Sequence, residues 1–194
     1  MVRSARRLEK IARVLAHRQP GLTVVMENIH DPHNVSAIFR TCDAVGVMNV
    51  ELVYTVEKFP RIGKKSSSSA NKWVEYRRHR SVEECFALLR REGTRILATR
   101  PGGGARTLYE LDLTQRTAFV VGNEHRGVSG EASLLADACV QIPMFGMIES
   151  LNVSVAAGIC LYEALRQRLA TGLLDRSQLS PELLAALEAA WSRK

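Results

Sequence analysis

The feature that most constrains the fold is a repeated alternation between short apolar segments and segments with helical spacing. Short apolar runs bounded by Gly, Pro, Asn or Asp predict buried strands, and apolar residues three and four apart predict helices. The predicted strands are residues 22–26, 49–53, 95–99, 118–121 and 138–142, with a further candidate at 73–76. Strands that alternate with helices predict an α/β fold, in which a mostly parallel sheet carries helices on both faces.

The length of 194 residues suits one well-buried domain with appended terminal helices. Apolar and basic residues alternate at helical spacing near the start, which predicts a basic amphipathic helix within residues 1–18. A central domain is expected at 19–170 and a helical extension at 171–194. In the extension, Ser180 is expected to cap a last helix with Pro181 at its first position.

Charge and cysteine usage limit the class of protein. The formal net charge of +7 favours a polyanionic partner, although charge alone does not define a nucleic-acid site. The cysteines are far apart in apolar contexts, which is typical of reduced core residues. Neither a signal segment nor a run long enough to span a membrane is evident. We therefore expect a cytoplasmic protein without a membrane segment. The cysteines are Cys42, Cys85, Cys139 and Cys160.

Three loops follow predicted strands and are expected to converge, because the carboxyl ends of parallel strands meet at one edge of a sheet. The first, residues 27–33, leads into a helix that Asn34 is expected to cap and that carries Arg40. For Arg40 the sequence leaves two readings open, a surface ion pair with Asp43 or a functional position beside this loop. The second loop begins at Gly122 and contains Glu124.

The third loop, residues 142–149, is apolar and is interrupted by Pro143 and Gly146, so it is not expected to be regular structure. At Ser150 the pattern becomes helical, and Ser150 is expected to cap a helix that begins at Leu151. Small residues at Ser154, Ala156, Ala157 and Gly158 predict a slim helix packed closely against another element. An ordinary helix cap and a ligand site both fit this junction.

The sequence gives little support for the common nucleotide-binding and metal-binding motifs. The Gly-rich segments 100–104 and 122–127 match neither the dinucleotide-binding fingerprint nor the phosphate-binding P-loop, which weakens an oxidoreductase or NTPase reading. No metal-binding spacing is evident. The loop at 54–71, rich in Lys and Ser, fits either simple disorder or a contact with RNA.

Residues 27–46, 119–129 and 142–156 resemble, in order, the three motifs of the SpoU (TrmH) branch of the SPOUT methyltransferases. The resemblance covers almost the whole chain. It implies a C-terminal trefoil knot, with S-adenosylmethionine as methyl donor and no metal. It also implies a homodimer in which each site borrows from its neighbour, with the helix from Leu151 at the interface.

The same resemblance assigns roles to individual residues. Because a guanidinium stays protonated at neutral pH, we expect Arg40 to hold an RNA phosphate and stabilise the developing alkoxide rather than act as the base. The implied catalytic residues are Asn34, Arg40, Glu124, Ser150 and Asn152. The implied cofactor-binding residues are Thr99, Gly122, Ile142, Met144 and Leu151.

The activity implied by the resemblance is 2'-O-methylation of a tRNA ribose, at guanosine 18 of the D-loop. Two alternatives stay open: methylation of ribosomal RNA or another tRNA position, and a non-catalytic RNA-binding protein. Basic residues in several segments are candidate contacts to tRNA phosphates. These are Arg6, Arg7, Lys10, Arg13, Arg90, Arg166, Arg168 and Arg176.

Overall fold

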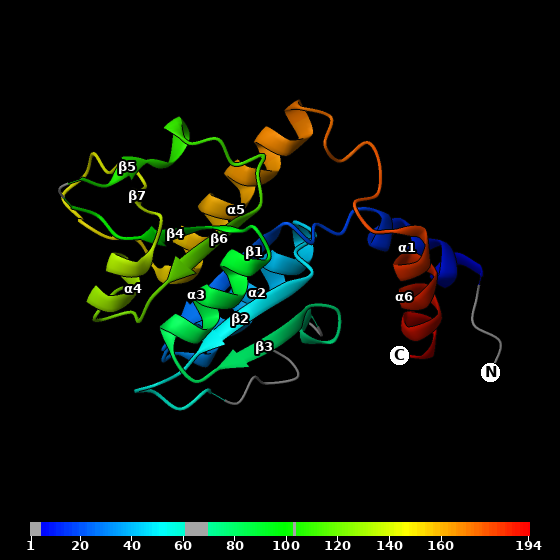
Figure 1. Ribbon diagram of the computed structural model, residues 1–194, viewed down its shortest axis with the longest axis horizontal. Helices are drawn as coiled ribbons and strands as arrows, with labels where there is room; N and C mark the ends of the chain where they lie inside the picture. Colours follow the sequence, from blue (N-terminus) through cyan, green and yellow to red (C-terminus); the bar gives the residue numbers. More distant parts are fainter. Residues whose placement is uncertain (1–4, 61–69, 103) are drawn as a thin grey trace.

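A computed structural model describes residues 5–60, 70–102 and 104–194, and its centre is a seven-stranded sheet (Figure 1). The strand order is β3-β2-β1-β6-β4-β7-β5, and the strand pairs are parallel. This confirms the predicted α/β class with a parallel sheet. Residues 61–69, half of the predicted loop at 54–71, lie outside the described residues. The strands are β1 Leu22–Glu27, β2 Asn49–Val53, β3 Glu75–His79, β4 Arg95–Thr99, β5 Arg106–Thr107, β6 Thr117–Val121 and β7 Ala138–Gln141.

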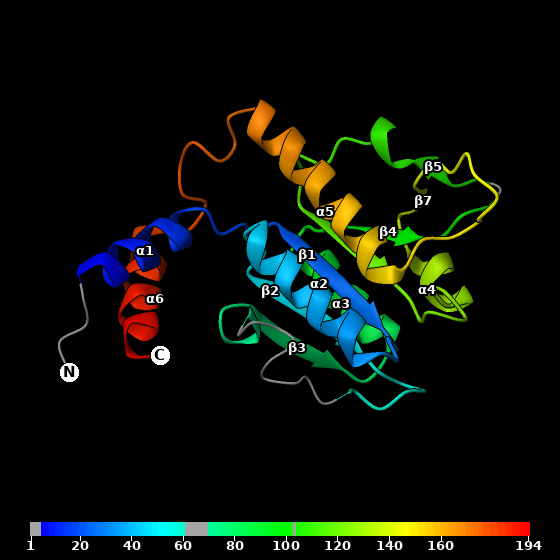
Figure 2. The same ribbon diagram turned by 180° about the vertical axis from the view of Figure 1, so that it is seen from behind.

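Helices cover both faces of the sheet, as predicted. Helices α2 and α5 pack against each other on one face, and α3 and α4 lie on the other face (Figure 2). A parallel sheet covered in this way presents its carboxyl edge to solvent, where connecting loops gather. The helices are α1 Ala5–Ala16, α2 Pro32–Ala44, α3 Val82–Arg91, α4 Gly130–Leu135, α5 Val153–Ala170 and α6 Pro181–Arg193, with short 3-10 turns η1 Ala70–Lys72 and η2 Leu108–Glu110.

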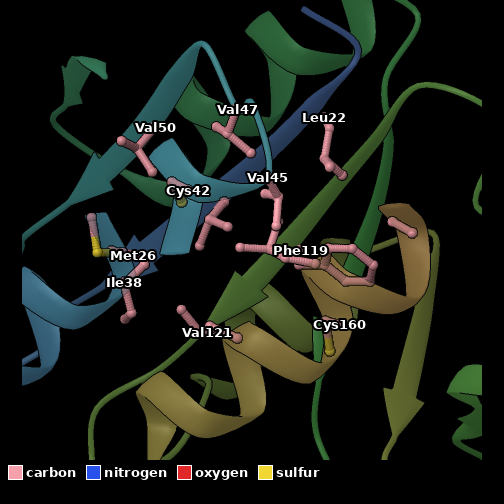
Figure 3. Packing of buried hydrophobic residues seen from close by; sticks show 14 of the residues in the cluster. Leu22, Met26, Ile38, Cys42, Val45, Val47, Val50, Phe119, Val121 and Cys160 are labelled. Carbon is pink, nitrogen blue, oxygen red and sulfur yellow. The ribbon is translucent and has the colours of Figure 1, made fainter. Parts of the chain in front are cut away.

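The core is divided by the sheet into two layers. Successive residues of a strand face opposite sides, so Met26 packs toward α2 and α5 whereas Val25 packs toward α3 and α4. Phe119 and Cys160 lie in the first layer (Figure 3). Burial of a side chain such as Phe119 contributes about 1.5–3 kcal/mol to stability. Strands buried on both faces explain why the apolar runs were continuous in the sequence.

The two terminal helices pack on each other beside the sheet (Figure 1). Trp191 of α6 packs against Trp73, with ring centroids 4.8 Å apart and the rings tilted by 50°, and the Arg18 guanidinium lies 5.1 Å from the Trp191 ring. Ser180 caps α6 and Pro181 begins it, as predicted. Within the described residues, the structure contains no helix that is long and apolar enough to cross a membrane.

Two predicted helix starts were wrong. Helix α2 is capped by Asp31, whose side chain accepts from the His33 N–H, and Asn34 lies inside the first turn. Pro32 takes the first helical position because its fixed φ angle suits it. Helix α5 is capped by Asn152 rather than Ser150 and begins at Val153.

The sheet also differs from prediction at its two edges. Strand β3 begins at Glu75 rather than at residue 73, because an edge strand exposes polar side chains instead of an apolar run. Strand β5, which was not predicted, has only two residues and pairs with β7. The cysteines are free, and three of them are buried, while Cys139 is half-buried.

Candidate active site

A pocket of about 420 Å³ lies at the carboxyl edge of the sheet, where the ends of β4, β6 and β7 meet the start of α5. The loops after β6 and β7 line it as predicted, and side chains connect them to the loop after β1. Its wall includes the five residues predicted to bind the cofactor, together with three predicted catalytic residues. These are Thr99, Gly122, Ile142, Met144 and Leu151, and Glu124, Ser150 and Asn152.

The three loops are joined by hydrogen bonds between short polar side chains. The Asn34 amide donates to a Glu124 oxygen at 2.8 Å, and the Asn152 amide donates to the Asn34 oxygen at 3.0 Å. These residues are far apart in the sequence but come from the first turn of α2, the loop after β6 and the cap of α5. The network fixes the relative positions of all three predicted motifs.

Glu124 is the centre of this network. Besides Asn34, its carboxylate accepts the main-chain N–H groups of His30 at 2.9 Å and Asp31 at 3.1 Å. Partial burial raises the pKa of Glu124, but the hydrogen bonds from Asn34 and the main chain outweigh burial and lower it overall. Glu124 is therefore a carboxylate at neutral pH and can keep the amide of Asn34 oriented.

Glycine at position 122 is required by close packing of the backbone. A Cβ atom there would lie 2.2 Å from the main chain of Gly127 and Val128. Next to it, the Thr99 hydroxyl donates to the Val120 carbonyl at 2.8 Å, which ties the end of β4 to β6. A larger residue at 122 would push apart the loop that carries Glu124.

Two predicted catalytic residues are absent from the pocket wall: Asn34, which is bonded to the wall residues Glu124 and Asn152, and Arg40, which has no such link. Arg40 is exposed on α2 and has no hydrogen-bond partner among the described residues. The alternative ion pair with Asp43 is wrong, because Asp43 instead pairs with Arg18 at 2.6 Å. Arg40 is thus a free cation on the surface of α2.

Most of the basic residues predicted to contact RNA are exposed. Four of them project from α1 and another follows α5, whereas Arg90 and Arg166 already form ion pairs with Asp137 and Glu163. The residues exposed on α1 are Arg6, Arg7, Lys10 and Arg13, and the one after α5 is Arg176.

Arg168 does not fit this role, because its side chain is buried. It is 1% exposed and donates to the carbonyls of Gly21, Leu113 and Gln115 and to the side chain of Gln19. Burial lowers its pKa to about 10. A guanidinium with its donors satisfied inside the protein cannot reach RNA, so the prediction of a phosphate contact is wrong for Arg168.

Asn28 is a site-building residue that the sequence did not reveal. Its backbone has φ of 50°, and its side-chain oxygen accepts the N–H groups of Thr55, Val56 and Glu57 at 2.9, 3.0 and 3.1 Å. An Asn directly after a buried strand was the available signal, since Asn tolerates a positive φ better than most residues do. Through Asn28, the loop after β2 is attached to the site.

The described residues contain one group with metal-ligand chemistry, Glu51, His79 and Cys85 on the α3 side of the sheet. Both oxygens of Glu51 already accept from the Arg77 guanidinium, and His79 lies 2.6 Å from one of them. Arg77 also binds Glu92. This is the pattern of a buried ion-pair network, in which the negative charge is balanced by Arg77.

Comparison with known proteins places this fold and pocket in a family. Residues 21–162 match the SpoU rRNA Methylase family, and the chain belongs to it. A Thermus thermophilus relative, named tRNA (guanosine(18)-2'-O)-methyltransferase, is 48% identical over 192 residues, covering 99% of this chain and 98% of the relative. A protein of the same name from Escherichia coli is 44% identical, with 91% and 77% covered.

Solved structures agree with this assignment. The Aquifex aeolicus TrmH/SpoU tRNA modifying enzyme superposes with a TM-score of 0.90 at 39% identity, covering 97% of this chain and 95% of that one. The SpoU methyltransferase AviRb from Streptomyces viridochromogenes, solved with AdoMet, has a TM-score of 0.71 at 29% identity and covers 81% and 62%. The fold and the three motifs are therefore those of a SpoU methylase.

Proposed function

We propose that the protein is a tRNA ribose 2'-O-methyltransferase that uses S-adenosylmethionine and modifies guanosine 18 of the D-loop. The observation that carries the proposal is the Asn34–Glu124–Asn152 network, which joins the three family motifs at one pocket. The nearly full-length match to relatives named for this reaction supports the choice of substrate. The net charge of +7 suits an RNA partner.

The pocket fits S-adenosylmethionine in size and chemistry. Its volume of about 420 Å³ suits a nucleoside-sized ligand, and its walls combine apolar side chains with the main chain of Gly122 and Gly127. When bound, the cofactor supplies an electrophilic methyl group on a sulfonium. In this proposal Ile142, Met144 and Leu151 contact its apolar parts, while Thr99 and Gly122 let the main chain approach closely.

The catalytic roles follow from the chemistry of a ribose hydroxyl, which is a poor nucleophile until it loses its proton. Arg40 holds the phosphate beside the target ribose and stabilises the oxygen as negative charge develops. Glu124 orients Asn34, and Asn34 with Asn152 positions the RNA at the pocket. Ser150, on the exposed rim, donates or accepts one further hydrogen bond to the substrate.

In this proposal the enzyme is a homodimer, and Arg40 acts at the pocket of the partner subunit. Two features support a second copy. Arg40 lies away from the pocket of its own chain. Helix α5 also exposes Val155, Tyr162 and Leu169, whose spacing of seven residues places them on one stripe. A partner helix against this stripe would bury it.

The proposed architecture includes a trefoil knot in a three-part chain. Strand β7 lies between β4 and β5, which are consecutive in the sequence, so the connection from Thr99 to Arg106 must cross the end of β7. The chain leaving β7 then passes this connection to reach α5, an arrangement suited to a knot. The proposed parts are residues 1–18, 19–170 and 171–194, and the proposed location is the cytoplasm.

Binding of tRNA in this proposal uses exposed cations outside the pocket. Four lie along α1, which has no acidic residue in its first turn to offset them. Arg90 and Arg166 are exposed but already paired with carboxylates. When tRNA binds, a tRNA phosphate replaces the carboxylate partner of each. The residues are Arg6, Arg7, Lys10, Arg13, Arg90, Arg166 and Arg176.

The decisive experiment measures transfer of labelled methyl from S-adenosylmethionine to an unmodified tRNA transcript and to the same transcript with a 2'-deoxy residue at guanosine 18. Label on the first alone supports both the chemistry and the position. Label on both moves the target elsewhere in tRNA, and label on neither contradicts the proposal. Ribosomal RNA is then the next substrate to test, because a Haemophilus influenzae relative at 33% identity is named a 23S rRNA (guanosine-2'-O-)-methyltransferase.

The shared site is tested with mixed dimers. Subunits carrying Arg40→Ala and subunits carrying Asn34→Ala are each expected to be inactive as homodimers. A heterodimer of the two retains one pocket with intact Asn34 and an intact Arg40 from the partner, so about half of the wild-type activity per dimer is expected. Absence of activity in the heterodimer would place Arg40 and Asn34 in the same subunit's site.

A further inference from the structure

Arg126 lies on the rim of the pocket, although none of the roles above uses it. Residues on both sides of it line the pocket, namely Glu124 before it and Gly127 and Val128 after it. The Arg126 side chain itself is 55% exposed. Its guanidinium therefore faces solvent beside the network that positions the substrate.

The main chain that carries Arg126 is held in place by Asn123. The Asn123 side-chain oxygen accepts the N–H groups of His125 at 3.0 Å and Arg126 at 3.2 Å, and its amide donates to the Asn28 carbonyl at 2.9 Å. Asn123 is only 5% exposed. The position of Arg126 is thus fixed from inside the protein.

Glu57 is fixed in the same way from the neighbouring loop. Its main-chain N–H donates to the side chain of Asn28, the residue whose carbonyl binds Asn123. The chain of hydrogen bonds from Glu57 through Asn28 and Asn123 to Arg126 is closed by an ion pair. In that pair, Arg126 Nη2 lies 2.7 Å from Glu57 Oε1.

The ion pair is located where a substrate anion could replace the carboxylate. The guanidinium of Arg126, followed by the ring of His30 at 3.2 Å, holds the pKa of Glu57 below its ordinary value, so Glu57 is charged. The pair is partly exposed, 55% at Arg126 and 23% at Glu57, and ion pairs in contact with solvent contribute little net stability, whereas a guanidinium binds phosphate through two parallel hydrogen bonds. Replacement of Glu57 by a phosphate at Arg126 therefore requires little free energy.

We propose that Arg126 binds a phosphate of the substrate RNA next to the target ribose, and that Glu57 competes with that phosphate for Arg126. In the free protein Glu57 keeps the guanidinium on the rim. In the complex the phosphate takes its place, and Glu57 retains its contact with His30. The identity of the ligand as RNA rests on the proposed function, whereas the competition rests on the geometry of the two loops.

The test measures the affinity of an unmodified tRNA transcript for the full chain by fluorescence anisotropy at several salt concentrations. Arg126→Gln is expected to weaken binding about fivefold and to reduce the slope of log affinity against log salt by about one. Glu57→Gln is expected to strengthen binding about two- to fivefold, because the competing carboxylate is gone. The double variant is expected to bind like Arg126→Gln alone.

Glu110→Gln is the matched control, because Glu110 is exposed in η2 and forms no ion pair within the described part of the chain. Glu110→Gln removes one negative charge at a site distant from the two loops. The gain in RNA affinity from Glu57→Gln must therefore exceed the gain from Glu110→Gln. S-adenosylmethionine affinity should be unchanged in every variant, which reports an intact pocket.

Two results would overturn the proposal: unchanged RNA affinity in Arg126→Gln, or a gain from Glu57→Gln that persists when Arg126 is absent. Failure of the proposed function would be seen separately, as tRNA binding by the wild-type chain without methyl transfer to guanosine 18. The affinity measurements would still decide the competition between Glu57 and phosphate in that case.

Discussion

The two ends of the sheet use similar polar side chains in opposite ways. At the amino end, Arg18 donates to the carbonyl of Val47 and Arg168 donates to the carbonyls of Gly21 and Leu113, just before strands begin. Both arginines are 1% exposed. Arg18 also binds Asp43 and Arg168 also binds the side chain of Gln19, so most of their donors are paired inside the protein and this end of the sheet contributes stability.

At the carboxyl end, polar side chains bind one another and nearby main-chain N–H groups, and several of them line a pocket. Glu124 and Asn152 both line it, and Arg40 and Arg126 keep exposed guanidinium groups outside it. This difference between the two ends of the sheet shows that the number of arginines in a sequence does not predict how many of them bind a ligand. What matters is whether each guanidinium has donors left for a ligand.

The largest effect that can test this contrast is expected for Arg40→Ala. Loss of phosphate binding and alkoxide stabilisation should lower kcat about 100- to 1,000-fold, with no change in the free energy of unfolding. Arg40→Lys should recover only part of the rate, because an ammonium lacks the planar fork. Single-turnover methyl transfer and urea unfolding on the same preparations measure both. Full turnover by the Lys variant would contradict the assigned role.

Arg168→Ala should show the opposite pattern. It removes four hydrogen bonds of a buried side chain, including the Arg168 donor to the Leu113 carbonyl, so we expect the free energy of unfolding to fall by about 3 kcal/mol. Arg166→Ala is the matched control on the same helix, because the Arg166 side chain is 67% exposed and its partner Glu163 keeps the hydrogen bond from Gln167, so the loss should be under about 1 kcal/mol. Equal stability of the two variants would remove the distinction between the ends of the sheet.

Glu124→Gln gives a smaller effect that depends on pH. The pKa of Glu124 in the folded protein is below its ordinary value of 4.5, so its stabilisation is present above pH 4.5 and is lost as pH falls through the folded value. At pH 7 the variant should be about 1 kcal/mol less stable than wild type. The difference should shrink on acidification in urea titrations. A difference that grew with acid would mean that Glu124 is protonated in the folded state.

The smallest effects per residue are expected on α1. Replacing Arg6 and Lys10 by Gln should lower the slope of log RNA affinity against log salt by about two, while changing the free energy of unfolding by under about 0.5 kcal/mol. Anisotropy at graded salt and urea unfolding measure these quantities. A flat salt response in the wild type would show instead that exposure on α1 does not mean contact with RNA.

The sequence predicted the central strands well because β1 and β6 are buried on both faces and read as continuous apolar runs. It also predicted that three loops would converge, and the resemblance to the SpoU motifs named eight of the residues that line the pocket. It mislocated edge strand β3, whose burial depends on neighbours rather than on its own composition.

Features that depend on tertiary contacts were not accessible from sequence patterns. Ser150 and Asn152 are both good capping residues, and the structure distinguishes them because the Asn152 oxygen accepts the Ser154 N–H while the Asn152 amide donates to Asn34. Arg166 and Arg168 are two residues apart on one helix, yet one is exposed and the other is buried. The strand order around β7 likewise follows from packing across long separations in the chain.

The position of β1 between β2 and β6 has a consequence for synthesis on the ribosome. Strands β1 to β3 can assemble as soon as His79 has emerged, but β1 keeps an unpaired edge until β6 is complete at Val121. The pocket comes later still, because its wall includes Leu151 and Ala156. A nascent chain therefore exposes a hydrophobic strand edge for much of its translation, and a product that stalls before α5 has no complete pocket for the cofactor.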